Sequence, residues 1–416
     1  MIIERPIYLE RLIKRRENGM AKVITGIRRC GKSYLLHHLY GNWLRSQGVP
    51  SSCIISVELD DIRNAHLRTP QALYDHICSV TNDADTFYVF LDEIQYVEGF
   101  SDVINGLMHR SNLDVYVTGS NSRFLSSDIL TEFRGRGDEV QVRPLAFSEY
   151  LPAHGGTPAE GWVDYVAYGG MPLILSQPDD EMKASYLQSL FSKVYLSDIC
   201  ERDDVKHVEA LDTLIDIMAS ADGSLTNPSK IVRTFKSDGK KGISDKTVAR
   251  YLELLEDAFL MEKAKRFDIK GRKYIGALAK YYFEDTGLRN ARLNFRQQEE
   301  NHLMENVIYN ELRYRGWLVD IGLVEARERN GSGPLKSMQL EIDFVANKGS
   351  GRLYIQSAFA MPDSKKRQQE TRPFKSIDDS FKKIIVVKDA VKPWQDDKGI
   401  VTMGLFDFLL NPASWE

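Results

Sequence analysis

The stretch Gly26-Ile27-Arg28-Arg29-Cys30-Gly31-Lys32-Ser33 decides the fold of this chain. Two glycines that enclose four residues, followed by Lys and Ser, form a loop whose backbone N–H groups point inward at the phosphates of a nucleotide. The run Lys22–Thr25 before it predicts a strand, and the apolar spacing after Ser33 predicts a helix whose amino-terminal end also attracts phosphate. The stretch therefore predicts a P-loop between a strand and a helix.

Each position of this loop has a predicted role. The predicted nucleotide-binding residues are Gly26, Ile27, Arg28, Arg29, Cys30, Gly31, Lys32, Ser33 and Tyr34. We expect Lys32 to bridge the β- and γ-phosphates of ATP and the hydroxyl of Ser33 to ligate Mg²⁺. Cys30 is interpreted as a small filler residue of the loop.

Two carboxylates end a later apolar run. Phe87–Leu91 predicts a buried strand, and Asp92 and Glu93 follow it directly. We expect Asp92 to lie in the Mg²⁺ shell and Glu93 to polarise the water that attacks the γ-phosphate. The alternative is an acidic pair that caps the next helix.

Further catalytic candidates follow the next strand, Asp114–Val117. Ser120 and Asn121 are expected to sense the γ-phosphate and orient the water. Arg134 and Arg136 are candidates for an arginine finger that reaches the nucleotide of a neighbouring subunit in a homo-oligomer. Arg136 is preferred because two glycines flank it; ordinary surface salt bridges are the alternative.

Composition limits the class of protein. A chain of 416 residues with 43% hydrophobic and 27% charged residues predicts two to four globular domains. It has no apolar run of about 18 residues and no secretory signal, so we expect a cytoplasmic protein without a membrane span. Its four cysteines form no CxxC pair, which argues against a zinc site or a disulfide framework.

The order of apolar and amphipathic segments predicts an α/β protein. Residues 1–150 alternate predicted strands (also 53–58 and 139–142) and helices (34–46 and 70–80), which is typical of a parallel sheet with helices on both faces. A loop at 152–158 opens a helical lid or linker at 151–215. A winged-helix domain is predicted at 216–294 and a separate α/β domain at 295–416.

The predicted winged helix is basic. Between Thr226 and Lys280 there are 14 Lys and Arg against 7 Asp and Glu, in a chain of net charge −4. Ser244 is predicted to be the N-cap of a recognition helix at 245–257. The candidate DNA-binding residues are Lys246 and Arg250 on that helix and Lys270, Arg272 and Lys273 on the wing. The alternative is a module for packing or oligomerisation.

Taken together, these segments resemble a bacterial and archaeal family of AAA-type P-loop ATPases. The resemblance covers nearly the whole chain. Its carriers are Glu4-Arg5-Pro6, the P-loop, Leu91-Asp92-Glu93, Thr118-Gly119-Ser120, Gly135-Arg136, Pro144-Leu145-Ala146-Phe147, Gly169-Gly170-Met171-Pro172 and Tyr251–Glu256. It implies an AAA core with a helical lid, a winged helix and a C-terminal restriction-endonuclease-like domain, and it implies that Gly169-Gly170 is a lid turn.

The resemblance also implies a nuclease-like centre that has lost residues. Glu305 and Asp343 match the helix glutamate and strand aspartate of a PD-(D/E)xK nuclease, but Gln356 replaces the second acid and Ala358 replaces the lysine. Lys365 or Lys366 could take the place of that lysine. We interpret the domain as a degenerate nuclease fold that binds nucleic acid or a partner without cutting.

Two hypotheses about function remain open at this point. In the first, an ATP-driven motor or switch acts on nucleic acid through the winged helix and the silent nuclease-like domain. In the second, a regulatory or protein-remodelling ATPase binds a protein partner through its C-terminal domains. A nuclease is the least favoured, because Gln356 and Ala358 replace its acid and lysine.

Overall fold

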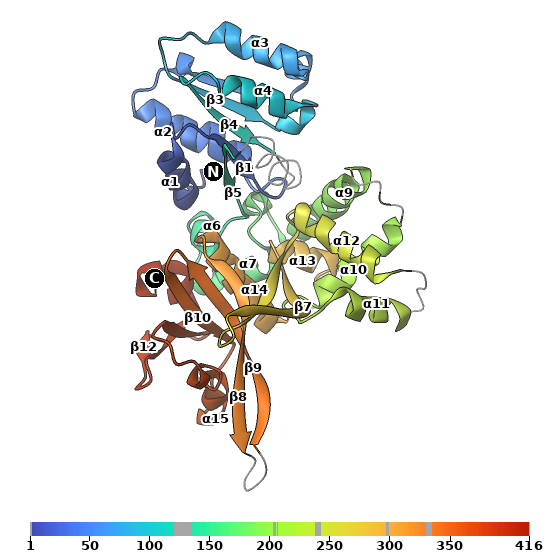
Figure 1. Ribbon diagram of the computed structural model, residues 1–416, viewed down its shortest axis with the longest axis vertical. Coiled ribbons are helices and arrows are strands. Elements are labelled where there is room, and N and C mark those ends of the chain that lie inside the picture. Colours follow the sequence, from blue (N-terminus) through green and yellow to red (C-terminus); the bar gives the residue numbers. More distant parts are fainter. Residues whose placement is uncertain are drawn as a thin grey trace. The chain divides into compact units, whose positions relative to one another are not determined.

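The structure is a computed structural model that describes residues 2–119, 135–202, 205, 207–237, 243–296, 299–329 and 335–415. The chain divides into two compact units. Unit 1 contains Met1–Pro144 together with Asp257–Phe259, and unit 2 contains Leu145–Glu256 and Leu260–Glu416 (Figure 1). Within the described ranges, no helix combines the length and the apolar character that crossing a membrane would require.

Unit 1 contains a parallel sheet, as the sequence predicts. Its strands are β1 (Ala21–Thr25), β2 (Ile54–Glu58), β3 (Phe87–Asp92), β4 (Leu113–Thr118) and β5 (Gly137–Gln141). They lie in the order β2-β3-β4-β1-β5, and every neighbouring pair is parallel. The expected α/β fold class is confirmed. Because β4 lies between β1 and β3, its carboxyl end lies next to the strand that precedes the P-loop and next to the strand that ends at Asp92.

Helices cover both faces of this sheet (Figure 1). They are α1 (Pro6–Arg15), a π-helical segment (Tyr34–Tyr40) that continues as α2 (Gly41–Ser46), α3 (Pro70–Val80), α4 (Phe100–Leu107) and short 3₁₀ turns at Ser51–Cys53, Ile62–Leu67 and Ile94–Tyr96. Leu73 of α3 and Val103 of α4 share one apolar core with Val23 of β1. On the other face the ring of Tyr40 packs against Phe90. The sheet is therefore buried on both sides, which explains why its strands are apolar along most of their length.

Unit 2 begins with helices. They are α6 (Phe147–His154), α7 (Pro158–Tyr168), a 3₁₀ turn (Pro172–Ser176), α8 (Asp180–Leu190), a π-helical segment (Phe191–Leu196), α9 (Ser197–Arg202), α10 (Val208–Ser220), α11 (Pro228–Ser237), α12 (Asp245–Asp257), α13 (Thr286–Arg292) and α14 (Glu300–Tyr314).

The prediction that a loop begins at Pro152 was wrong. Helix α6 continues through Pro152 to His154, and its C-cap is Gly155, which has φ 78°. The rings of Phe147 and Tyr150 pack against Tyr165 of α7. This packing stabilises the helix despite the proline.

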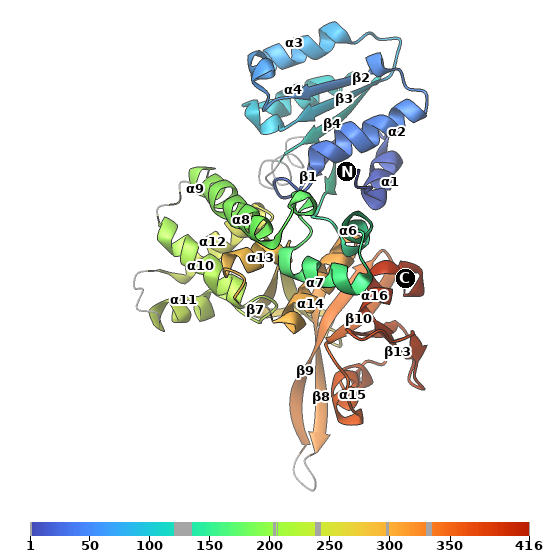
Figure 2. The same ribbon diagram turned by 180° about the vertical axis from the view of Figure 1, so that it is seen from behind.

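Unit 2 also contains a mixed sheet of eight strands, the first two of which lie between α12 and α13 in the chain. Its strands are β6 (Met261–Asp268), β7 (Lys273–Phe283), β8 (Leu318–Arg329), β9 (Leu335–Lys348), β10 (Gly351–Ala358), β11 (Lys382–Val387), β12 (Trp394–Gln395) and β13 (Ile400–Gly404), in the order β12-β13-β11-β10-β9-β8-β6-β7. The helices α15 (Ser364–Thr371) and α16 (Leu405–Leu410) and 3₁₀ turns at Phe374–Ser376 and Pro412–Ser414 complete it. Strands β8 and β9 form a long hairpin (Figure 2).

The segment predicted as a winged helix has the expected element order. Helices α10, α11 and α12 precede the antiparallel β6–β7 hairpin, and Thr226 forms an isolated bridge with Ala279 of β7. Ser244 caps α12, since its Oγ accepts a hydrogen bond from the Thr247 amide at 3.1 Å. Strand β6 also pairs in parallel with β8. The sheet thus extends across the predicted domain boundary at 294/295.

Candidate functional site

The P-loop of unit 1 has a backbone that requires glycine. Gly26 has φ 135° and Gly31 has φ 101°, values that other residues rarely adopt. A Cβ atom at Gly26 would lie 2.0 Å from the carbonyl oxygen of Val142. The spacing of the two glycines is therefore a steric requirement of this loop.

Lys32 lies across the loop. Its side chain is buried, and its Nζ donates to the carbonyl oxygens of Gly26 at 2.8 Å and Ile27 at 3.1 Å. Of the other predicted loop residues, Ile27 and Cys30 are buried, Arg28 and Tyr34 are half-buried and Arg29 is exposed. The ammonium group is thereby held against the first two residues of the loop.

Arg5 supports the loop from the amino terminus. Its Nη1 donates to the carbonyl of Cys30 at 3.0 Å and its Nη2 to the carbonyl of Arg143 at 2.7 Å, in a buried position. The Cys30 Sγ lies 3.3 Å from the Val142 carbonyl oxygen. Both contacts join the P-loop to the segment after β5. The sequence analysis listed Arg5 only as part of the resemblance and gave it no role.

Asp92 ends β3 in a buried position beside the P-loop helix. The hydroxyl of Thr118 donates to its carboxylate, and the Nε2 of His37 lies 3.7 Å from its Oδ2. Burial raises the pKa of Asp92, but hydrogen bonds with His37, Thr118 and Ser33 outweigh burial and hold the pKa below its usual value. The structure thus brings the Ser33 hydroxyl together with an ionised carboxylate.

Glu93 follows in a left-handed conformation, with φ 52° and ψ 52°. Such a conformation is unfavourable for a residue with a side chain and occurs most often at functional sites. Its amide donates to Thr118 Oγ1 at 3.0 Å, and Gln95 Nε2 donates to its carboxylate. The sharp turn therefore holds a second, half-buried carboxylate at the same edge of the sheet.

Thr118 links the two carboxylates; it lies in the polar stretch Thr118–Asn121 predicted to sense the γ-phosphate, from which Ser120 and Asn121 were the selected candidates. It ends β4 and bonds both the Asp92 side chain and the Glu93 backbone. Ser120, Asn121 and Arg134, which the sequence analysis selected, lie outside the described residues. The usable signal was the position of Thr118 at the end of a strand, since carboxyl ends of neighbouring parallel strands meet at one edge.

Arg136 lies at the other edge of the sheet. It precedes β5, its side chain is exposed, and its carbonyl accepts a hydrogen bond from the Ala21 amide at 2.9 Å. Ala21 begins β1, whereas the P-loop follows Thr25 at the end of β1. A strand of this length spans about 16 Å, so Arg136 and the P-loop of the same chain lie at opposite ends of the strand.

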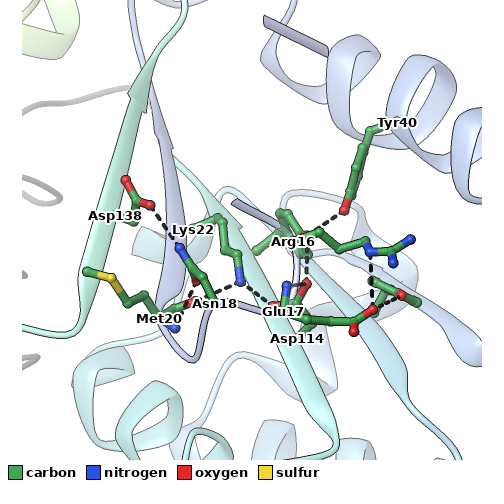
Figure 3. A network of polar contacts seen from close by, with 10 residues as sticks. Arg16, Glu17, Asn18, Met20, Lys22, Tyr40, Asp114 and Asp138 are labelled. Atoms are coloured by element: carbon green, nitrogen blue, oxygen red, sulfur yellow. Dashed lines mark hydrogen bonds and ion pairs between the residues drawn. The ribbon is translucent and has the colours of Figure 1, made fainter. Parts of the chain in front are cut away.

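A buried polar network anchors the amino-terminal ends of the central strands (Figure 3). Lys22 of β1 forms an ion pair with Asp114 of β4, and both side chains are buried. Asp114 also accepts hydrogen bonds from the Tyr116 hydroxyl at 2.7 Å and the Glu17 amide at 3.0 Å. The Tyr40 and Tyr116 hydroxyls are 2.5 Å apart, which connects the helix after the P-loop to this network.

In unit 2 the predicted DNA-binding side chains are all exposed. They are Lys246 and Arg250 of α12, Lys270 and Arg272 in the turn of the β6–β7 hairpin, and Lys273 at the start of β7. Glu253 of α12 is exposed as well.

The predicted nuclease-like residues also lie in unit 2. Glu305 is on α14, Asp343 is on β9 and Gln356 is on β10. The lysine nearest to them comes from β7: Lys280 Nζ lies 2.8 Å from Glu305 Oε1. Lys366, considered from the sequence, instead pairs with Glu370 at 2.5 Å. Among the residues that the structure describes, no group of three or more His, Cys, Asp or Glu side chains is arranged to hold a metal ion.

Two known protein families match successive regions of the chain. The family described as AAA domain matches residues 18–151, and a family described as domain of unknown function DUF8612 matches residues 159–299. The Walker-type ATPase PABY2304 of Pyrococcus abyssi is similar in structure with a TM-score of 0.45 and 15% identity, covering 70% of this chain and 96% of that one.

Two relatives extend over most of the chain. The uncharacterized protein MJ1544 of Methanocaldococcus jannaschii is 25% identical over 370 residues, which is 86% of this chain and 79% of that protein. An uncharacterized protein of Haemophilus influenzae is 34% identical over 416 residues and covers 99% of each chain. The chain therefore belongs to the same family as this Haemophilus influenzae protein and has a P-loop AAA domain at residues 18–151.

Proposed function

We propose that the protein binds and hydrolyses ATP with Mg²⁺, and that it acts as a switch or motor on nucleic acid. One observation supports the ATPase assignment above all others. The P-loop, the Asp92–Glu93 pair and Thr118 meet at the carboxyl edge of one parallel sheet. In open α/β sheets this edge is where ligands bind.

The residues at this edge fit ATP and Mg²⁺. Gly26 and Gly31 have the positive φ values that the curled backbone of this loop requires, and the amides of such a loop at the start of a helix can bind phosphate. Bound Mg²⁺ would neutralise charge on the phosphates. Ser33 and Asp92 would hold that ion, Lys32 would contact the phosphates, and Glu93 would accept the proton of the attacking water.

The position of Arg136 supports action on a neighbouring chain. Because Arg136 and its own P-loop lie at opposite ends of β1, it can serve a nucleotide only in a second subunit of a homo-oligomer. Arg136→Ala is expected to lower kcat about 10³-fold with ATP affinity retained, since an arginine finger stabilises charge only in the transition state. Steady-state phosphate release and isothermal titration with ATP measure the two quantities.

Mixing two inactive variants tests the same role. Arg136→Ala retains Glu93, and Glu93→Gln retains Arg136, so mixed oligomers contain complete composite sites and should recover activity. Arg45→Ala, which removes another exposed arginine of unit 1, is the matched control. Full activity of Arg136→Ala alone would remove Arg136 from the mechanism.

Action on nucleic acid is supported by the exposed basic side chains of α12 and the hairpin turn. We expect duplex or single-stranded DNA to stimulate ATP hydrolysis in a salt-dependent way, because phosphate contacts release counterions. Lys246→Ala with Arg250→Ala should weaken DNA binding and reduce the salt slope by about 2, one for each lost phosphate contact. Hydrolysis and DNA-binding isotherms across a salt series measure both.

Arg233→Ala is the control for that experiment, since it removes an exposed arginine from the neighbouring helix α11. An ATPase that DNA neither binds nor stimulates would contradict the nucleic-acid proposal. The regulatory alternative, in which unit 2 binds a protein partner, would then take its place.

A further inference from the structure

A buried lysine of unit 2 forms ion pairs with two carboxylates. Lys280 of β7 is buried, with its Nζ 2.8 Å from Glu305 Oε1 and 2.9 Å from Glu341 Oε1. These carboxylates come from α14 and β9, two elements remote from β7 in the sequence. One ammonium group thus bridges two carboxylates of different elements.

The carboxylates around Lys280 stabilise the positive charge of its ammonium group. Burial would lower the pKa of Lys280, but the charges of Glu305, Asp343 and Glu341 outweigh burial and raise it, so the ammonium remains protonated. Burial and the neighbouring charge of Glu305 raise the pKa of Asp343, whereas the charge of Lys280 opposes that rise. Asp343 Oδ2 also accepts a hydrogen bond from the Ser357 amide at 2.8 Å.

The backbone of β7 is fixed to the same elements. The Tyr282 hydroxyl donates to Glu305 Oε1 at 2.7 Å, and the Tyr282 ring stacks on Tyr309 of α14 with centroids 4.3 Å apart. Asn306 and Asn310 of α14 each donate to the Phe283 carbonyl, at 2.8 and 2.9 Å. The end of β7 that follows Lys280 is therefore held against α14.

We infer that the Lys280 ammonium takes the place of a divalent metal ion in this centre, so that Glu305, Glu341 and Asp343 bind no metal, and the ion pairs of Lys280 with Glu305 and Glu341 instead join β7 to α14 and β9. A metal ion and the ammonium would need the same oxygens of Glu305 and Glu341, and two cations so close would repel each other. The residues present do not fit a metal-dependent nuclease. This inference is independent of the ATPase proposal, because it concerns unit 2 alone.

The test measures Mn²⁺ binding to the full chain, without nucleotide, by electron paramagnetic resonance. The wild type is expected to show no Mn²⁺ binding that depends on Asp343. Lys280→Met frees the carboxylates and should bind Mn²⁺ at least about tenfold more tightly than the wild type. The double variant Lys280→Met with Asp343→Asn should bind Mn²⁺ no more tightly than the wild type does. Lys263→Met, at an exposed lysine of the same hairpin, should behave as the wild type.

Melting temperature gives a second measurement. Mn²⁺ should raise the Tm of Lys280→Met and leave that of the wild type unchanged, because only the variant has a vacant cation position. Mn²⁺ binding by the wild type that disappears in Asp343→Asn would overturn the inference. A folded Lys280→Met variant that binds Mn²⁺ no more tightly than the wild type would also overturn the inference. If Lys280→Met does not fold, the comparison of wild type with Asp343→Asn still decides.

Discussion

Glu93→Gln is expected to lower kcat for ATP hydrolysis by about 10² to 10⁴-fold, the usual contribution of a general base, while ATP affinity is retained. The amide cannot accept a proton from water, yet its oxygen can still accept the hydrogen bond from Gln95. The turn at residue 93 is therefore preserved. Steady-state phosphate release gives kcat, and isothermal titration with ATP and Mg²⁺ gives the affinity.

Glu98→Gln is the matched control, because it neutralises an exposed carboxylate five residues further along the same segment. It should hydrolyse ATP at the wild-type rate. Full turnover by Glu93→Gln would show that the base lies elsewhere and would falsify the assignment of the Asp92–Glu93 pair.

Lys32→Ala is expected to weaken ATP binding roughly 100-fold, because charge-assisted hydrogen bonds to phosphate contribute about 1.5–3 kcal/mol each. The variant also loses the hydrogen bonds from Nζ to the carbonyls of Gly26 and Ile27, which help hold the loop in its binding conformation. Hydrolysis should fall with the affinity. Titration with ATP and Mg²⁺ measures the first effect and phosphate release the second.

Lys14→Ala controls for the loss of a positive charge from unit 1. Lys14 is exposed on α1 and forms an ion pair with Glu10, one turn away, at 2.5 Å. Its removal should leave ATP binding unchanged. If Lys32→Ala binds ATP as tightly as the wild type does, the loop is not the phosphate site.

Unit 1 was largely predictable from the sequence. The strands predicted at 22–25, 53–58, 87–91, 114–117 and 139–142 all exist, with bounds within two residues of those of β1 to β5. Parallel strands with both faces covered are short, apolar and separated by amphipathic helices, so the pattern along the chain is enough to find them. The P-loop followed from the fixed spacing of Gly26 and Gly31, which the backbone geometry requires.

Contacts between distant segments could not be predicted in this way. The sequence analysis missed Thr118 as the link between Asp92 and Glu93, since the order β2-β3-β4-β1-β5 is needed to place β4 beside β3. It also missed the Lys22–Asp114 ion pair, because a lysine in a strand gives no sign that a partner lies 92 residues away.

By itself the sequence determined the α/β class, the P-loop and the paired carboxylates, because each depends on residues that are close neighbours in the chain. Only the tertiary structure decided which cation neutralises the carboxylates of unit 2. Lys365 and Lys366 were the candidates near β10, but Lys280 reaches Glu305 and Glu341 from a hairpin that belongs, in sequence, to the predicted winged helix. Pairing of β6 with β8 brings that hairpin into the C-terminal sheet, and no local pattern encodes such a long-range pairing.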